Sequence, residues 1–245
     1  MYKITAIAKN TFIEAMRNKV LYTIVAFAIM MIGSSFFLAE LTVGANIKVM
    51  KDMGFAFISI FGIFISIFIG IGLVYKEIDK RTIFTIISKP IARYEFIICK
   101  YLGLLLTLAV QVSIMLIFFY IVEYFVERRI DLYMLLGIFA IFLELMIVTA
   151  FSIFFSSFTT PFLSGLFTVS LFIIGHLTPD LLQIGEKSTK VVIIYTTQII
   201  YYIIPNLENF NLKNRLVHHL PITYSEIAYI TVYGLFWVSF LLFLS

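Results

Sequence analysis

Long stretches with little or no charge constrain this chain more than any other feature of its sequence. A helix needs about 20 apolar residues to cross the hydrocarbon core of a bilayer. Each such stretch must be helical in lipid, because every backbone amide needs a partner within its own segment. The sequence predicts transmembrane helices at residues 20–39, 54–75, 101–122, 132–155, 161–178 and 227–245.

Composition excludes a soluble domain. Hydrophobic residues make up 62% of the chain and charged residues 13%, against about 45–50% and about 25% in soluble domains. The basic residues lie beside the apolar stretches, where topology and anionic lipid headgroups account for them, so we expect no binding of nucleic acid. Cys99 is the single cysteine, which rules out an internal disulfide. The predicted fold is an all-α integral membrane protein, with residues 1–245 as one transmembrane domain.

The distribution of Lys and Arg predicts the orientation of the helices. Basic residues before the first predicted span and between the second and third outnumber those on the opposite side near the spans. The basic flanks contain Lys3, Lys9, Arg17, Lys19, Lys76, Lys80, Arg81, Lys89, Arg93 and Lys100; the opposite side contains Lys48, Lys51, Arg128 and Arg129, and four more in the longer segment before the last span. The positive-inside rule then places both termini in the cytoplasm.

Two further helices are predicted outside the spans. Residues 1–19 have an apolar stripe at steps of three and four, which is typical of an amphipathic elbow helix on the inner leaflet. Val191–Ile204 is apolar but short for a span and is followed by Pro205, so we predict a re-entrant or interfacial helix within an extracytoplasmic loop at 179–225. Its tyrosines suit the level of the headgroups.

The segment 76–100 predicts a short cytoplasmic helix followed by a turn. Ile78, Thr82, Ile83, Ile86 and Ile87 have helical spacing. Pro90 in Ser88-Lys89-Pro90 then ends the helix, because proline lacks the N–H and has a fixed φ. The alternative is an ordinary basic loop that obeys the positive-inside rule.

In this segment the chain resembles the permease subunits of the ABC-2 transporter family. The matching residues are Glu77, Thr82, the turn Ser88-Lys89-Pro90-Ile91-Ala92-Arg93, and Lys100-Tyr101-Leu102-Gly103; Arg81 stands where many relatives have glycine. A second similar stretch is Pro205-Asn206-Leu207-Glu208-Asn209-Phe210 before the last predicted span. The order of these motifs, with the six spans, extends the resemblance over nearly the whole chain.

The resemblance implies a division of labour between subunits. A separate cytosolic ATPase would bind ATP and Mg²⁺ and dock on a coupling helix in this segment, through Glu77, Lys80, Arg81, Thr82, Lys89, Pro90 and Arg93. This chain has no G-x-x-x-x-G-K-[ST] loop for phosphates, so we expect it to be neither an enzyme by itself nor a binder of a cofactor. The resemblance further implies a homodimer or heterodimer in the cell membrane of a prokaryote, operating as an exporter of the type V kind.

Glu144 lies midway along a predicted span, and an acidic residue there is a functional candidate because burying its charge costs at least ~2.5 kcal/mol. Gln111 in the preceding span is its candidate partner. The alternative is a protonated carboxyl group that only joins two helices. His176 and the adjacent pair His218 and His219 suggest a metal, but adjacent histidines do not share a helix face, so we expect no metal site.

Two other classes of function stay open on the sequence. A membrane-embedded enzyme would need a cluster of polar groups within the spans, and few are available. A non-transporting scaffold of the same fold would use the extracytoplasmic loop to contact a partner. Neither the substrate nor the direction of transport follows from the sequence.

Overall fold

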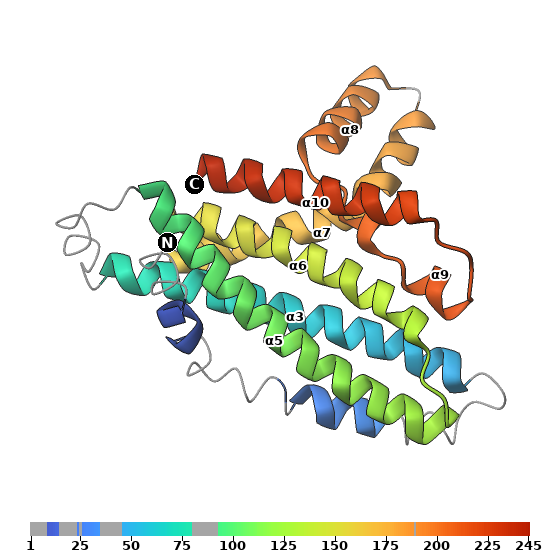
Figure 1. Cartoon of the computed structure of the whole chain (residues 1–245). Helices are drawn as coiled ribbons and strands as arrows, with labels where there is room; N and C mark the ends of the chain where they lie inside the picture. Colours follow the sequence, from blue (N-terminus) through green and yellow to red (C-terminus); the bar gives the residue numbers. More distant parts are fainter. Residues whose placement is uncertain (1–8, 15–23, 25, 35–45, 80–92, 189) are drawn as a thin grey trace.

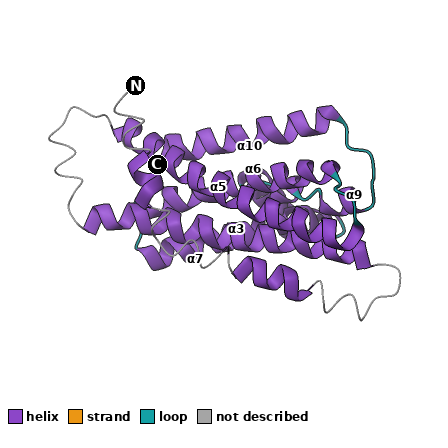
Figure 2. Ribbon diagram, turned by 60° about the horizontal axis from the view of Figure 1, so that its bottom comes forward, coloured by secondary structure: helices purple, strands orange, loops and turns teal. Residues whose placement is uncertain are grey.

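The fold is a bundle of long helices. The computed structural model describes residues 9–14, 24, 26–34, 46–79, 93–188 and 190–245, and these residues contain helices and no strands. Figure 1 shows α3 (Asn46–Asp79), α5 (Arg93–Glu127), α6 (Leu135–Ser156) and α10 (Tyr224–Leu244) lying side by side, with α7 (Pro161–Glu186) behind them. The view in Figure 2 gives the same arrangement.

Shorter helices follow α7. They are α8 (Val191–Ile203), the 3-10 helix η2 (Leu207–Phe210) and α9 (Lys213–Val217); another 3-10 helix, η1 (Leu132–Met134), leads into α6. The end of α7 packs with α8 as a hairpin that projects from the bundle (Figure 1). We call the end of the bundle where α3 begins and α9 lies the α9 end.

The helix α6 forms the centre of the bundle. It packs against α3, α5, α7 and α10. Of its apolar stretch 72% is buried, against 22% for α7 and for α10. A helix that is hydrophobic on all sides belongs in the interior, and apart from Glu144 the sequence of α6 is apolar or carries small hydroxyl groups. Ser164 of α7 donates a hydrogen bond to the Ser152 carbonyl of α6, so small residues let these helices approach closely.

The described residues provide five helices that are long and apolar enough to span a membrane, or six if the bent pair Val191–Ile203 and Leu207–Val217 is one span. This confirms the predicted all-helical membrane fold. The predicted first span, 20–39, is described only at residues 24 and 26–34, where it is helical, and the predicted elbow, 1–19, only at 9–14. The elbow and the membrane position of α8 stay predictions.

Three helices extend well beyond the spans predicted there. α3 begins at Asn46 instead of residue 54, α5 covers Arg93–Glu127 instead of 101–122, and α7 ends at Glu186 instead of residue 178. α7 continues through Pro179, whose missing N–H leaves the Gly175 carbonyl without its usual donor. The hydroxyl of Thr178 donates to that carbonyl at 2.8 Å, so the helix continues without an unpaired buried carbonyl.

Lys51 shows why α3 begins early. The sequence placed it in a loop, but it lies in α3 with 3% of its side chain exposed. Its Nζ is 3.1 Å from Oε1 of Glu123 and 2.8 Å from Oε2 of Glu127, both on α5, and 3.6 Å from Oδ2 of Asp131. The charge is tolerated because carboxylates surround it. We call Lys51, Glu123, Glu127 and Asp131 the lysine cluster.

Candidate functional site

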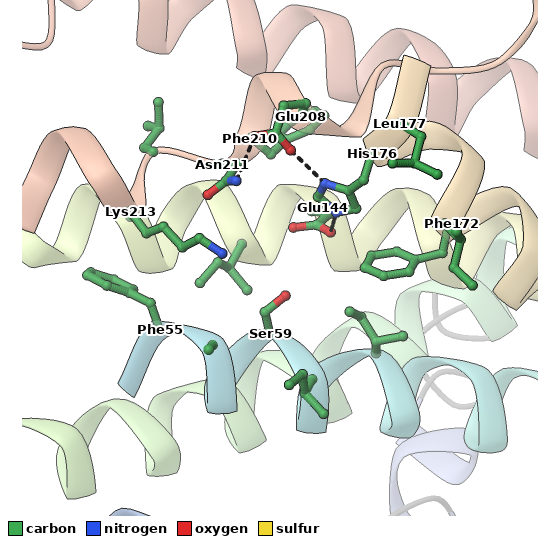
Figure 3. Close-up of a pocket in the computed structure, with 17 residues that line it drawn as sticks. Phe55, Ser59, Glu144, Phe172, His176, Leu177, Glu208, Phe210, Asn211 and Lys213 are labelled. Carbon is green, nitrogen blue, oxygen red and sulfur yellow. Dashed lines mark hydrogen bonds and ion pairs between the residues drawn. The ribbon is translucent and has the colours of Figure 1, made fainter. Parts of the chain in front are cut away.

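A chamber of about 450 Å³, with a mostly apolar lining and a cluster of polar side chains, lies between α3, α6, α7 and the segment around η2. Its polar lining residues are Ser59, Glu144, His176, Glu208, Asn211 and Lys213. Figure 3 shows these side chains converging from four parts of the chain, with the rings of Phe55, Phe172 and Phe210 around them.

The centre of the chamber is a triad formed by Glu144, His176 and Glu208. Nε2 of His176 is 2.8 Å from Oε1 of Glu144, and Nδ1 is 3.0 Å from Oε2 of Glu208. Figure 3 shows the imidazole between the two carboxyl groups. The Glu144 side chain is 3% exposed and the Glu208 side chain 43% exposed. The triad therefore connects a buried acid in the middle of α6 with an acid at the surface.

The two N···O contacts form a continuous hydrogen-bonded chain from Glu144 to Glu208. Each contact needs one proton, carried either by the imidazole nitrogen or by the facing carboxyl oxygen. The imidazole therefore links the two carboxyl groups through both of its nitrogens.

Close packing positions the triad. Gly175 precedes His176, and a Cβ there would be 2.8 Å from Cγ of Leu207 and 3.0 Å from the carbonyl oxygen of Pro205. The glycine thus lets α7 approach the chain immediately before Glu208. Asn206 accepts a hydrogen bond from the Glu208 N–H and so begins η2, and its own N–H donates to the Tyr233 hydroxyl of α10 at 2.8 Å.

Further polar groups surround the triad. Asn211 Nδ2 donates to Oε1 of Glu208 at 2.7 Å, which gives this carboxyl group a second partner. Figure 3 shows the Lys213 side chain directed into the chamber. Within the described part of the chain the Lys213 ammonium makes no hydrogen bond or ion pair. The ring of Phe172 contacts that of His176 edge-on, with centroids 4.7 Å apart, and shields one side of the triad.

Glu144 lies in the chamber, but Gln111 does not line it. The partner of Glu144 is His176. Gln111 is buried in α5, and neither atom of its amide group has a hydrogen-bond partner in the described part of the chain. Which residues of two helices face each other depends on how each helix is rotated and packed. The sequence alone does not give that rotation.

The predicted docking residues are only partly described. Glu77 lies near the end of α3, and Arg93 is the first residue of α5; only their backbone is described. Lys80, Arg81, Thr82, Lys89 and Pro90 lie outside the described residues. Their role therefore stays a prediction.

The other histidines lie at the α9 end. His219 Nε2 is 3.7 Å from Oδ2 of Asp131, beside the lysine cluster, and His218 caps the end of α9. Among the described residues no three His, Cys, Asp or Glu side chains are grouped so that they could bind a metal ion.

Sequence reasoning missed His176, Glu208 and Lys213 as members of one site. One signal was available: Glu208 and Phe210 belong to the motif before the last span, and both line the chamber. A polar motif next to a membrane helix suggests a functional surface. The sequence does not show which helix this motif faces, and the structure does.

A comparison with known families agrees with the helical architecture. The family model described as "ABC-2 family transporter protein" matches residues 5–244. No curated protein matches the sequence.

Proposed function

Because this chain belongs to the ABC-2 transporter family, we propose that it is the permease subunit of an ATP-binding cassette exporter driven by a separate cytosolic ATPase. The match over residues 5–244 carries this proposal. Members of the family are membrane subunits for transport and not enzymes themselves, which removes the membrane-embedded enzyme as an alternative.

The ATPase docks on residues 76–93 in this proposal. The apolar part of α3 ends at Gly72, and the helix continues to Asp79, about 10 Å further at 1.5 Å per residue. The end of α3 at Asp79 then lies beyond the apolar part of the helix. Lys80, Arg81, Lys89 and Arg93 supply charges for a protein contact there.

The remaining parts of the assembly follow from the same role. ATP and Mg²⁺ bind to the partner subunit, since this sequence lacks a phosphate-binding loop. Two permease chains form the pathway, as a homodimer or a heterodimer, in the cell membrane of a prokaryote with both termini in the cytoplasm. The α9 end then faces outward, and the chamber lies in the outer half of the protein.

A pull-down from detergent tests this proposal. The tagged chain is purified from its native cells beside Arg81→Glu/Arg93→Glu and beside the control Arg128→Glu/Arg129→Glu, which reverses two charges at the α9 end. We expect an ATPase with a phosphate-binding loop, identified by mass spectrometry, with the wild type and the control only. Recovery of no such ATPase with any of the three chains would contradict the proposal.

A further inference from the structure

An apolar groove lies next to the chamber along α3 and α7. It has a volume of about 750 Å³ and shares Ile60, Ile63, Phe172 and Ile173 with the chamber. Its other lining residues are all apolar: Phe64, Ile67, Phe68, Ile71, Gly72, Pro161, Phe162, Gly165, Leu166 and Val169. Chamber and groove are therefore neighbours that share part of their walls, and the polar side chains lie on the chamber side.

The groove opens to the side of the bundle. Phe68 is 71% exposed and Phe162 is 79% exposed, one from each wall. Both walls belong to helices that are long and apolar enough to span a membrane, so we infer that the opening faces the lipid chains. Between Ile60 and Gly72 the groove runs for about 18 Å at 1.5 Å per residue, which suits an extended acyl chain.

The chamber presents acceptor oxygens on one side and a cation on the other. The acceptors are the carboxyl oxygens of Glu144 and Glu208. Lys213 supplies a positive charge, which interacts electrostatically with Asp52 of α3 but makes no hydrogen bond or ion pair in the described part of the chain. A ligand that carries an anionic group and an amine contacts both, while a headgroup without an amine offers the carboxyl groups no cationic donor.

We propose that chamber and groove together bind an amphiphile whose zwitterionic headgroup carries a phosphate and an amine. The phosphate contacts Lys213, the ammonium group contacts the carboxylates of the triad, and a hydrocarbon chain occupies the groove between α3 and α7. The claim that this amphiphile is the substrate transported by the permease rests on the proposed function. Its binding to the isolated chain does not depend on the ATPase.

The position of the groove next to the chamber favours an amphiphile over a small polar solute. A solute would fill the chamber alone and leave the groove to bulk lipid. The chain of an amphiphile would occupy the groove and contact its apolar walls by van der Waals packing. Its headgroup then lies towards the α9 end.

Lipid binding to the purified chain tests the proposal without an ATPase. Two probes with identical chains are compared, dioleoyl phosphatidylethanolamine and dioleoyl phosphatidylglycerol, by native mass spectrometry after delipidation. We expect the wild type to retain the ethanolamine lipid more tightly. Lys213→Ala should weaken its binding roughly tenfold, the loss of one charge-assisted hydrogen bond, while Lys187→Ala, an exposed lysine elsewhere, should not change it.

The groove is tested with a matched pair of substitutions. Val169→Trp fills the groove, whereas Val232→Trp adds the same bulk to the exposed face of α10. We expect only the first to abolish tight retention, with both variants monodisperse in gel filtration. Equal retention of both lipids by the wild type, or equal retention by the two tryptophan variants, would mean general annular lipid and overturn the proposal.

A third binding measurement uses a soluble headgroup that has no hydrocarbon chains. Glycerophosphoethanolamine that bound as tightly as the lipid would identify a polar solute and also overturn the proposal. Failure of lipid binding while an ATPase is still captured leaves the permease assignment intact. If the lipid binds but no ATPase is captured, the proposed role of an ATPase is contradicted and the proposed lipid site is not.

Discussion

Two groups of ionisable side chains, each with a buried glutamate, hold neighbouring helices together. The lysine cluster joins α3 to α5 near the α9 end, and the triad joins α6, α7 and η2. A buried charge without a partner is expensive, so each group is sensitive to the loss of one member. The two groups differ in that the triad lines a chamber.

Lys51→Met keeps the length of the side chain and removes its charge. Glu123, with 0% of its side chain exposed, would lose its cationic partner and face Glu127 and Asp131. We expect a loss of about 3–5 kcal/mol in the free energy of unfolding. Lys48→Met, an exposed lysine one turn earlier in α3, is the control. Thermal unfolding in detergent should show a large fall in the melting temperature for Lys51→Met alone; equal shifts would contradict this role.

His176→Leu would leave the carboxyl group of Glu144 buried without a hydrogen bond. We expect it to cost about 1–3 kcal/mol of stability. The double variant Glu144→Leu/His176→Leu removes both polar groups. Its loss of stability should be smaller than the sum of the losses of the two single variants, because the two side chains interact directly. A double-mutant cycle of unfolding free energies measures this coupling. Strict additivity would show that the contact contributes nothing.

At the scale of the helices, the all-helical membrane fold was predictable because a bilayer demands long apolar stretches. α3 and α7 extend beyond the predicted spans, where local chemistry accommodates residues that normally end a span. Lys51 is charged but surrounded by carboxylates, and Pro179 is followed by more helix because Thr178 replaces the missing donor. Contacts between helices, such as Glu144 with His176, were not predictable, since the rotation of each helix depends on packing.

Thr178→Val tests the account of the proline in α7. The change keeps the shape of the side chain but removes the hydroxyl group that donates to the Gly175 carbonyl. We expect a loss of about 1 kcal/mol in the wild type. In the Pro179→Ala background the N–H of residue 179 can donate instead, so the same change should have little effect there. An equal loss of melting temperature in both backgrounds would contradict this explanation.

At the scale of the whole molecule, α3 connects the two proposed sites. It is one helix from Asn46 to Asp79; its first half lines the chamber, its second half lines the groove, and its end adjoins the proposed docking segment. An ATPase that moved this end would move a wall of the groove against α7. In this proposal α3 links the first residues of the docking segment, 76–79, to the wall of the chamber.

Site-specific crosslinking tests the central claim, that an ATPase docks on residues 76–93, most directly. Cys99 is the single cysteine and is buried, so a Cys99→Ser chain accepts one new cysteine at Arg81→Cys or, as a control at the α9 end, at Arg129→Cys. Each is labelled with a thiol-linked photocrosslinker in native membranes. We expect an ATPase with a phosphate-binding loop to be crosslinked from Arg81→Cys only. Crosslinking of that ATPase from Arg129→Cys, and not from Arg81→Cys, would contradict the docking site and the orientation of the chain.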